Sequence, residues 1–473
     1  MKANLSNKSN FARRDFLKTL GTFSAGVVAS PLLSSKAFGK KKKSKKNVLF
    51  IISDDLTKTM SCYDHPVVKT PNIDKLAKMG VQFDHAYCNY AVCNPSRSSF
   101  LTGMLPETTT ILDNRKALQS IIGDWITLPA LFKQNGYYTM NLGKIFHTTH
   151  EKHNDFKAWD KLFQAKPTEL GKKGVSRNIT DGELKWCNWR AAEGTDEDQQ
   201  DGQYAKLAVD FLKEKHEKPF FLAVGFHKPH DPFVAPKKYF KMYPIENCTP
   251  PELPEKWKLP YKHTLPGATS IFNKFSDQDK REFLRSYYAC CSFMDAQVGK
   301  ILNALEESGQ LDDTLIVFFG DHGYHLGEHN WWNKVTIFEK GTSAPFIVVD
   351  PSARKKGVRS DAMFEFIDIY PTLAELVDLK NVPAYLEGRS FAGVVKDPSQ
   401  SFRSEVRAIV NRGEMIGRTV KNVKWRYTEW DNGKKGRELY SQISDPVEYN
   451  NLAEIKEYED VIAEMRELLY QKY

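Results

Sequence analysis

Asn47-Val-Leu-Phe-Ile-Ile-Ser53-Asp54-Asp55 is the stretch from which the fold of this chain follows most directly. The residues between Asn47 and Ser53 are all apolar, which is typical of a strand buried on both faces of a parallel sheet. Two aspartates come directly after it, at the carboxyl end of the predicted strand. Ligands of open α/β sheets bind beyond the carboxyl ends of the strands, so this stretch also predicts where a functional site lies.

Downstream of this stretch, strand and helix patterns alternate. We predict helices over 72–80, 128–135, 204–214 and 281–307, and further strands over 137–142, 219–225, 314–320 and 345–349. Such alternation indicates an α/β fold with a large, mostly parallel central sheet sandwiched by helices. After about residue 400 the pattern changes to short strands over 406–410, 415–421 and 424–430, a turn at Asp431-Asn-Gly433 and a helix over 457–470. These segments predict a small C-terminal antiparallel-sheet-plus-helix subdomain.

The N-terminal residues have the pattern of an export signal. Arg13-Arg14-Asp-Phe-Leu-Lys precedes a weakly apolar stretch over 21–33, as in Tat-type signals. That stretch is shorter than the ~20 residues of a membrane span, so we expect no span in the mature protein. The expected organisation is a signal peptide at 1–39, a Lys-rich linker at 40–46, a catalytic domain at 47–400 and an α+β subdomain at 401–473. The Tat translocase would then be a partner, and the protein periplasmic or secreted.

The basic charge of the chain is confined to this leader. Residues 1–46 hold twelve Lys or Arg and one acid, a charge of +11, whereas the whole chain carries +9, which leaves −2 for residues 47–473. A body with this balance has no electrostatic footprint for nucleic acid. The seven cysteines are odd in number and lack the paired C-x-x-C spacing of a zinc site.

Cys93-Asn-Pro-Ser-Arg97-Ser-Ser-Phe-Leu-Thr-Gly103 predicts a loop that enters a helix with Cys93 at its N-terminus. Pro95 fits this placement because proline is tolerated in a first helical turn. The helix dipole and Arg97 would favour negative charge beside the Cys93 side chain. A lone cysteine is usually a packing residue, so the neighbouring motifs decide how this one is interpreted.

A second pair of candidate metal ligands follows another predicted strand. Asp321-His322 comes after the strand over 314–320, as Asp54-Asp55 comes after the first one. Two carboxylate clusters that meet at one sheet edge repel each other unless a cation lies between them. Oxygen-rich ligands favour Ca²⁺ or Mg²⁺.

Cationic and imidazole side chains also follow predicted strand ends. With Arg97, they would hold an anionic tetrahedral group over the cation. These residues are Lys144, His147, His227, His230 and Lys334.

The Cys93–Gly103 segment resembles the signature of the type I, formylglycine-dependent sulfatases, which have the alkaline-phosphatase-like fold. Three further segments are most similar to the iduronate-2-sulfatase branch: Gly143-Lys-Ile-Phe-His147, His227-Lys-Pro-His230 and Asp321-His-Gly-Tyr-His-Leu-Gly-Glu-His329. The match runs from residue 47 to the end of the chain. The resemblance implies a sulfuric ester hydrolase acting on a sulfated carbohydrate, either iduronate-2-sulfate or another polysaccharide-derived sulfated sugar.

Carried over residue by residue, the resemblance implies that Cys93 is the modified residue. A formylglycine-generating or anaerobic sulfatase-maturating enzyme would oxidise it to formylglycine (3-oxoalanine), whose hydrate attacks sulfur. The resemblance implies Ca²⁺, rather than Mg²⁺, held by Asp54, Asp55, Cys93, Asp321 and His322.

The resemblance also implies roles for the remaining site residues. Arg97 and Lys144 would stabilise the hydrate, with Lys144 also in contact with the substrate. His230 and Lys334 would hold the sulfate and assist the leaving alcohol. His147 would act on the hydrate to expel sulfate and restore the aldehyde.

Two other functions are compatible with these residues. One is a phosphoesterase on the same fold, although zinc members of the superfamily typically use a Thr or Ser nucleophile. The other is a non-catalytic binder of sulfated glycans. Five tryptophans could either stack on sugar rings or pack in the core: Trp159, Trp186, Trp189, Trp331 and Trp332.

Overall fold

The structure is a computed structural model that describes residues 45–473, apart from 149, 268 and 473. The expected signal peptide and residues 40–44 of the linker lie outside the described residues. Within the described part of the chain, no helix combines the length and the apolar character that crossing a membrane requires.

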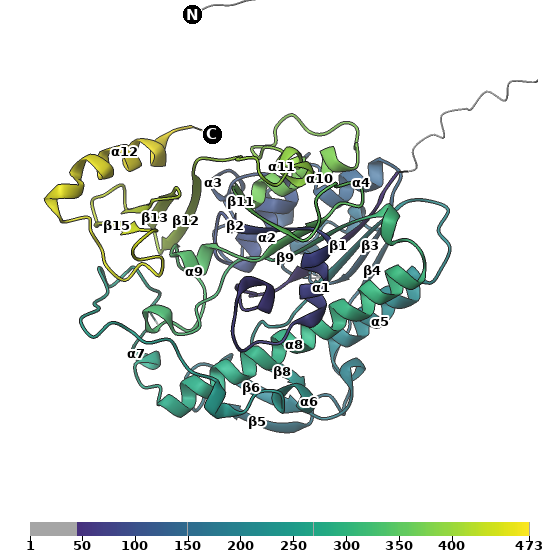
Figure 1. Cartoon of the computed structure of the whole chain (residues 1–473), viewed down its shortest axis with the longest axis horizontal. Coiled ribbons are helices and arrows are strands. Elements are labelled where there is room, and N and C mark those ends of the chain that lie inside the picture. The colour runs from purple at the N-terminus through teal and green to yellow at the C-terminus, as the bar shows by residue number, and fades with distance from the viewer. Residues whose placement is uncertain (1–44, 149, 268, 473) are drawn as a thin grey trace, which may run out of the picture. The chain divides into compact units, whose positions relative to one another are not determined.

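A large eight-stranded sheet forms the centre of the described chain (Figure 1), with strand order β11-β2-β10-β9-β1-β7-β3-β4. The apolar run is β1 (Asn47–Ser53), which lies between β7 (Phe220–Phe226) and β9 (Thr314–Gly320) and is parallel to both. In this sheet, β10 (Phe346–Val349) is antiparallel to both of its neighbours. The other strands are β2 (Val81–Tyr87), β3 (Tyr138–Gly143), β4 (Lys161–Phe163) and β11 (Val358–Glu365).

Helices cover both faces of this sheet, as its uninterrupted apolar strands require. Leu49 and Ile51 of β1 face the core formed with α1 (Pro71–Met79), α5 (Gln200–Leu212) and α8 (Asp277–Glu307). Val48, Phe50 and Ile52 face the opposite core, formed with α2 (Cys93–Thr102), α4 (Leu128–Gln134) and α10 (Ile369–Leu376). The α/β architecture with helices on both faces is therefore confirmed.

The C-terminal residues form a separate four-stranded antiparallel sheet (Figure 1). Its strands are β12 (Val406–Arg412), β13 (Met415–Lys421), β14 (Trp425–Trp430) and β15 (Arg437–Ser441). The final helix, α12 (Glu459–Tyr470), packs its apolar face on this sheet through Ile462, Met465 and Leu469. The predicted antiparallel sheet and helix are thus present, with β15 as a strand that the sequence analysis did not include.

A third, three-stranded sheet lies between β4 and α8 in the chain and was not predicted. It contains β5 (Gly174–Asn178), β6 (Asn188–Ala192) and β8 (Phe233–Pro236), with β6 parallel to β8. The long helix α8 begins four residues earlier than predicted because Ser276 and Asp279 form a capping box. The short helices are α3 (Pro106–Thr109), α6 (Lys237–Phe240), α7 (Thr269–Phe272), α9 (Glu339–Thr342) and α11 (Ala392–Lys396).

Candidate active site

The site forms where the carboxyl ends of the central strands meet. Ser53, the last residue of β1, is in register with Phe226 of β7 and Gly320 of β9. The Asp54 amide donates to the Phe226 carbonyl at 3.1 Å, and the Asp321 amide donates to the Ser53 carbonyl at 3.2 Å. Parallel pairing therefore places Asp54-Asp55 next to Asp321-His322, as the sequence predicted.

The neighbouring strand β3 adds Lys144 to the same edge. Gly143 is in register with Gly225 of β7, and the two backbones approach closely there. A Cβ atom on Gly225 would lie 2.0 Å from the Lys144 carbonyl oxygen, so only glycine allows this approach.

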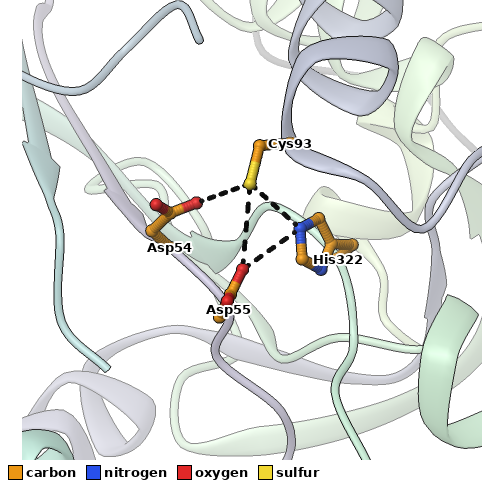
Figure 2. Close-up of side chains that lie close together, drawn as sticks. All are labelled: Asp54, Asp55, Cys93 and His322. Carbon is orange, nitrogen blue, oxygen red and sulfur yellow. Dashed lines mark hydrogen bonds and ion pairs between the residues drawn. The ribbon is translucent and has the colours of Figure 1, made fainter. Parts of the chain in front are cut away.

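Cys93 is the first residue of α2, as expected, and its thiol points at the acidic turns (Figure 2). The Cys93 Sγ atom lies 3.3 Å from Asp54 Oδ1, 3.8 Å from Asp55 Oδ1 and 3.5 Å from His322 Nε2. The helix is fixed in this position by Ser96, whose hydroxyl donates to the Asp321 carbonyl at 2.5 Å. Gly103 caps the C-terminus of α2, directly after Thr102, with a φ of 70° that favours glycine.

Three cationic side chains surround the acidic groups. Arg97 donates to Asp321 Oδ2 at 2.8 Å and to Asp54 Oδ1 at 3.2 Å, and it also bonds the carbonyl oxygens of Lys144 and Ile145. Because Arg97 is fully buried with all of these partners, it ties the strand ends together. Lys144 pairs with Asp54.

Lys334 is the third cation, and it reaches the centre of the site. Its ammonium group pairs with Asp55 and lies 3.0 Å from Cys93 Sγ. The indole of Trp331 supports the loop by donating to the Lys334 carbonyl at 2.8 Å.

The electrostatics of the cluster follow from this mixture of charges. Burial raises the pKa of Asp54, but Lys144, His230 and Arg97 outweigh it and hold the pKa well below its usual value. The pKa of Asp55 is also lowered, against burial, by His230 and Lys334. Burial lowers the pKa of Lys334, yet Asp55 and the other anionic groups raise it well above its usual value. The carboxylates and the ammonium groups therefore stay charged in a fully buried site.

Helix α8 supports the turn that contains Asp55. Asp55 has a φ of 62°, uncommon for a residue other than glycine. The hydroxyl of Tyr287 donates to the Asp55 carbonyl at 2.6 Å and accepts from the Thr57 amide at 3.0 Å. The Asp55 amide in turn donates to Asp321 Oδ1 at 3.0 Å.

The donor set fits a hard divalent cation. Asp54, Asp55, Cys93 and His322 offer ligand atoms that all lie within 4.8 Å of one another, and all four residues are buried. Asp55 Oδ2 is buried without a hydrogen-bond partner among the described residues, although buried polar atoms are rarely left unpaired. The Nδ1 atom of His322 lies 2.9 Å from the Gly323 carbonyl, which leaves Nε2 directed at the cluster. Carboxylate oxygens in such number favour Ca²⁺ or Mg²⁺.

Of the three other predicted histidines, His227 lies against Asp201, with 3.5 Å between its Nδ1 atom and Asp201 Oδ1, and the other two differ in their distance from the cluster. His230 Nε2 lies 3.9 Å from Asp54 Oδ2 and 3.8 Å from Asp55 Oδ2. His147 is mostly buried, and among the described residues no hydrogen bond or ion pair joins it to the cluster. Burial, and secondarily the charge of Lys144, lowers the pKa of His147 to about 3, so its imidazole is neutral.

The loop that carries His230 depends on residues that the sequence analysis missed. Asp201 of α5 accepts from the His227 amide at 3.0 Å and from the Lys228 amide at 2.8 Å. Lys228 then donates to the carbonyls of His230 and Pro232, both at 2.7 Å. Asp201, like Tyr287, is distant in sequence from the motif that it supports, and no local pattern identifies it.

Several residues near the motifs have structural roles instead. His325 bonds Thr336 at 2.7 Å, and His329 bonds the Glu448 carbonyl at 3.0 Å, so neither joins the cluster. The side-chain amide of Asn94 donates through Nδ2 to the carbonyls of Asp113 and Lys116 and anchors the loop that they form. Among the tryptophans, Trp159, Trp331 and Trp332 are buried packing residues, and Trp186 and Trp189 pack partly buried against the α8 side of the core.

Comparisons with known proteins agree with this geometry. The Sulfatase family model matches residues 46–379, and the model described as N-sulphoglucosamine sulphohydrolase, C-terminal, matches residues 327–473. A sulfatase of Formosa agariphila is 33% identical over 451 residues, which cover 90% of this chain and 86% of that protein.

Two further comparisons concern a second relative and a solved structure. Iduronate 2-sulfatase of Homo sapiens is 35% identical over 356 residues, which cover 70% of this chain and 64% of the human protein. A structure in complex with D-glucosamine-2-N,6-O-disulfate has a TM-score of 0.72 at 23% identity, covering 90% of this chain and 97% of that one. This last likeness shows a shared fold.

Proposed function

The chain belongs to the sulfatase family, whose members hydrolyse sulfate esters, and we propose that it desulfates a sulfated carbohydrate through a Cys93-derived formylglycine and Ca²⁺. One observation carries the proposal. The Cys93 side chain lies at a helix N-terminus, with Lys334 at 3.0 Å, Asp54 at 3.3 Å and His322 at 3.5 Å. A buried thiol among three charged or ligating groups is poorly explained by packing alone. The carbohydrate is supported by relatives such as human iduronate 2-sulfatase.

The cation would be held by Asp54, Asp55, Asp321 and His322, together with the modified Cys93. A bound Ca²⁺ stabilises negative charge on a sulfate oxygen, and the hydrated aldehyde of formylglycine supplies a nucleophilic hydroxyl. Asp55 Oδ2, which has no hydrogen bond among the described residues, and His322 Nε2, which is directed at the cluster, support this ligand set.

The residues of the chain have distinct tasks in this proposal. Lys144, which pairs with Asp54, and Lys334, which lies 3.0 Å from Cys93 Sγ, would bind the sulfate oxygens and stabilise the charge that develops on them. His230 is placed to protonate the leaving alcohol, since its Nε2 atom faces the carboxylates from the open side. Its ring is 27% exposed, which leaves access for a substrate.

Arg97 and His147 would act beside the reacting atoms. Arg97 holds Asp54 and Asp321 in place and adds positive charge behind the nucleophile. His147 is neutral and can accept a proton, which is the state needed to help release sulfate and restore the aldehyde.

Export and maturation complete the proposal. A maturation enzyme that oxidises Cys93 would be a partner, because an unmodified thiol lacks the aldehyde. The Arg13-Arg14 pattern supports Tat export to the periplasm or beyond, and that route carries folded proteins, so modification and metal binding would precede export.

The test is sulfate release from sulfated oligosaccharides by protein produced together with a maturation enzyme. We expect turnover that is abolished when Ca²⁺ is chelated and restored when Ca²⁺ is added back. The Cys93→Ala substitution should lower this turnover by more than about 10³-fold. Cys291→Ala is the matched control, because that thiol is equally buried and, among the described residues, its one hydrogen-bond partner is the Thr59 hydroxyl.

The alternatives predict different outcomes in the same assay. Faster release of phosphate from phosphate esters than of sulfate from sulfate esters would favour a phosphoesterase. Binding of sulfated oligosaccharides without turnover, by protein whose Cys93 is fully converted, would favour a non-catalytic binder.

A further inference from the structure

A cavity of about 400 Å³ adjoins the catalytic cluster. Its lining includes Asp54, Lys144 and His230 from the cluster, and it also includes Lys172 and Arg190 from the region of the three-stranded sheet. The volume lies within the range of small-ligand sites, roughly 300–1,000 Å³. The cavity therefore has room for part of a substrate beyond its sulfate group.

The strand geometry directs Arg190 into this cavity. Arg190 lies on β6 and is in register with Val234 of β8, which also lines the cavity. Its neighbour Trp189 faces the other way, where its indole donates to Glu282 of α8 at 3.1 Å. Because successive side chains of a strand point to opposite faces, Arg190 points away from α8 and beside the loop that carries His230.

Arg190 has no partner of its own in the described part of the chain. Its guanidinium makes no hydrogen bond or ion pair there. Arg177, on the adjacent strand β5, shows the contrast, since it pairs with Asp279 at 2.6 Å and Glu282 at 2.9 Å. An arginine offers five N–H donors in a planar fork, which suits the oxygens of a carboxylate or a sulfate.

The acidic residues of the lining do not neutralise Arg190. Asp54 is paired with Lys144 and Arg97, and both oxygens of Asp201 accept backbone amides. Asp231 faces His230 instead, with 3.7 Å between its Oδ1 atom and His230 Nδ1. Lys172 adds a further cation at the exposed side, although it also contacts Glu169 at 2.5 Å.

We propose that Arg190 binds a second anionic group of the substrate, so that the enzyme selects saccharides carrying a carboxylate or another sulfate besides the ester that it cleaves. This inference rests on the proposed function, because that function places the first sulfate at Lys144 and Lys334 and its leaving oxygen at His230. Arg190 is then a specificity residue that contacts the substrate away from the reacting sulfur.

The test measures binding first, in Cys93→Ala protein, so that turnover does not enter. Two ligand pairs are compared by calorimetry: a sulfated uronic acid glycoside against its carboxylate methyl ester, and a monosaccharide disulfate against its monosulfate. In at least one pair, we expect the ligand with two anionic groups to bind about tenfold tighter than the ligand with one. The Arg190→Gln substitution should remove that difference in affinity. Arg177→Gln is the control within the same hairpin and should retain the difference. The pair that responds identifies the anionic group.

Two results would overturn the inference: equal binding within both pairs, or a preference that persists in Arg190→Gln. Hydrolysis of a simple aryl sulfate by protein with converted Cys93 tests the proposed function separately. Aryl sulfate turnover without any preference in binding rejects the Arg190 site alone. If the protein prefers ligands with two anionic groups but releases sulfate from no ester, the anion site at Arg190 is supported and the proposed hydrolysis is rejected.

Discussion

At the scale of single residues, the site is a balance of buried charges. Lys144, Lys334 and Arg97 compensate carboxylates that burial alone would neutralise. Removing one partner of a buried charge pair leaves the other uncompensated, which costs more than the pair contributes. Each cation therefore affects both the folded state and the chemistry, and an informative variant must separate the two effects.

Lys334→Met should separate them. We expect kcat/KM for sulfate ester hydrolysis to fall by about 10²–10³-fold, as when a group that stabilises transition-state charge is removed. Ca²⁺ affinity, followed by calorimetry, should not fall, because the variant removes a positive charge that pairs with the ligand Asp55. Lys340→Met, in the helix α9 that follows, is the control, since the partner of Lys340 is Glu328 outside the cluster. Unchanged turnover in Lys334→Met would show that this ammonium group does not contact the substrate.

The sequence predicted which residues converge at the site but not every contact that they make there. Strand ends and the Cys93 segment predicted the convergence of Asp54, Asp321 and Cys93, because parallel pairing brings carboxyl ends to one edge. The clamp that Arg97 forms on the carbonyls of Lys144 and Ile145 was not predicted, because those partners depend on how α2 docks. Arg190 has no local motif at all, and only the register of β6 places it near the site.

At the scale of elements, α8 supports the catalytic turn through Tyr287. Tyr287→Phe removes the two hydrogen bonds that hold Asp55 and Thr57. We expect a loss of about 1–3 kcal/mol in the free energy of unfolding, the cost of leaving buried backbone groups unpaired, together with weaker Ca²⁺ binding. Thermal and chemical unfolding, each with and without Ca²⁺, would measure both effects.

Tyr288→Phe provides the matched control for that variant. Tyr288 is the next residue of α8 and is also buried, but its hydroxyl makes no hydrogen bond among the described residues. Its substitution should leave stability and Ca²⁺ binding nearly unchanged. Equal effects of the two substitutions would mean that ring packing, rather than the hydroxyl, supports the turn.

Some elements could be predicted from sequence, and others depend on partners far along the chain. The strands β1, β7 and β9 are apolar runs that any buried parallel strand would show. In contrast, β2 contains two polar residues: the Gln82 side chain donates to the Cys62 carbonyl, and Asp84 forms an ion pair with Arg359 of β11. An apolar run such as β10 also does not reveal its direction, and here it lies antiparallel between β2 and β9.

At the scale of the whole molecule, buried neutral histidines make stability depend on pH. Burial lowers the pKa of His65 to about 4, and its Nδ1 atom accepts the Val68 amide at 3.2 Å, which requires the neutral ring. The unfolded chain binds this proton near the usual pKa of about 6.5. The stabilisation is therefore complete above that pH and is lost as the pH falls toward 4. Burial lowers the pKa of His147 and His325 to about 3, so they act in the same direction.

His65→Asn tests this dependence, because the amide oxygen can still accept the Val68 amide without titrating. With Ca²⁺ held constant, we expect the free energy of unfolding of the natural protein to fall between pH 6.5 and 4 more steeply than that of the variant, by up to about 1.4 kcal/mol per pH unit. Denaturant unfolding at several pH values measures the two slopes. His150 is exposed, so the His150→Asn variant should keep the steeper dependence of unfolding free energy on pH. Identical slopes in all three proteins would contradict the assignment to His65.

The modification of Cys93 is the central claim for the whole molecule, and peptide mass spectrometry across Cys93 tests it most directly. The measurement is made on preparations with increasing amounts of a maturation enzyme, each assayed for sulfate release. Conversion of the thiol to the aldehyde lowers the peptide mass by about 18 Da, and we predict that specific activity rises in proportion to the converted fraction. Sulfate release that is equally fast in preparations carrying only the unmodified thiol would contradict the claim.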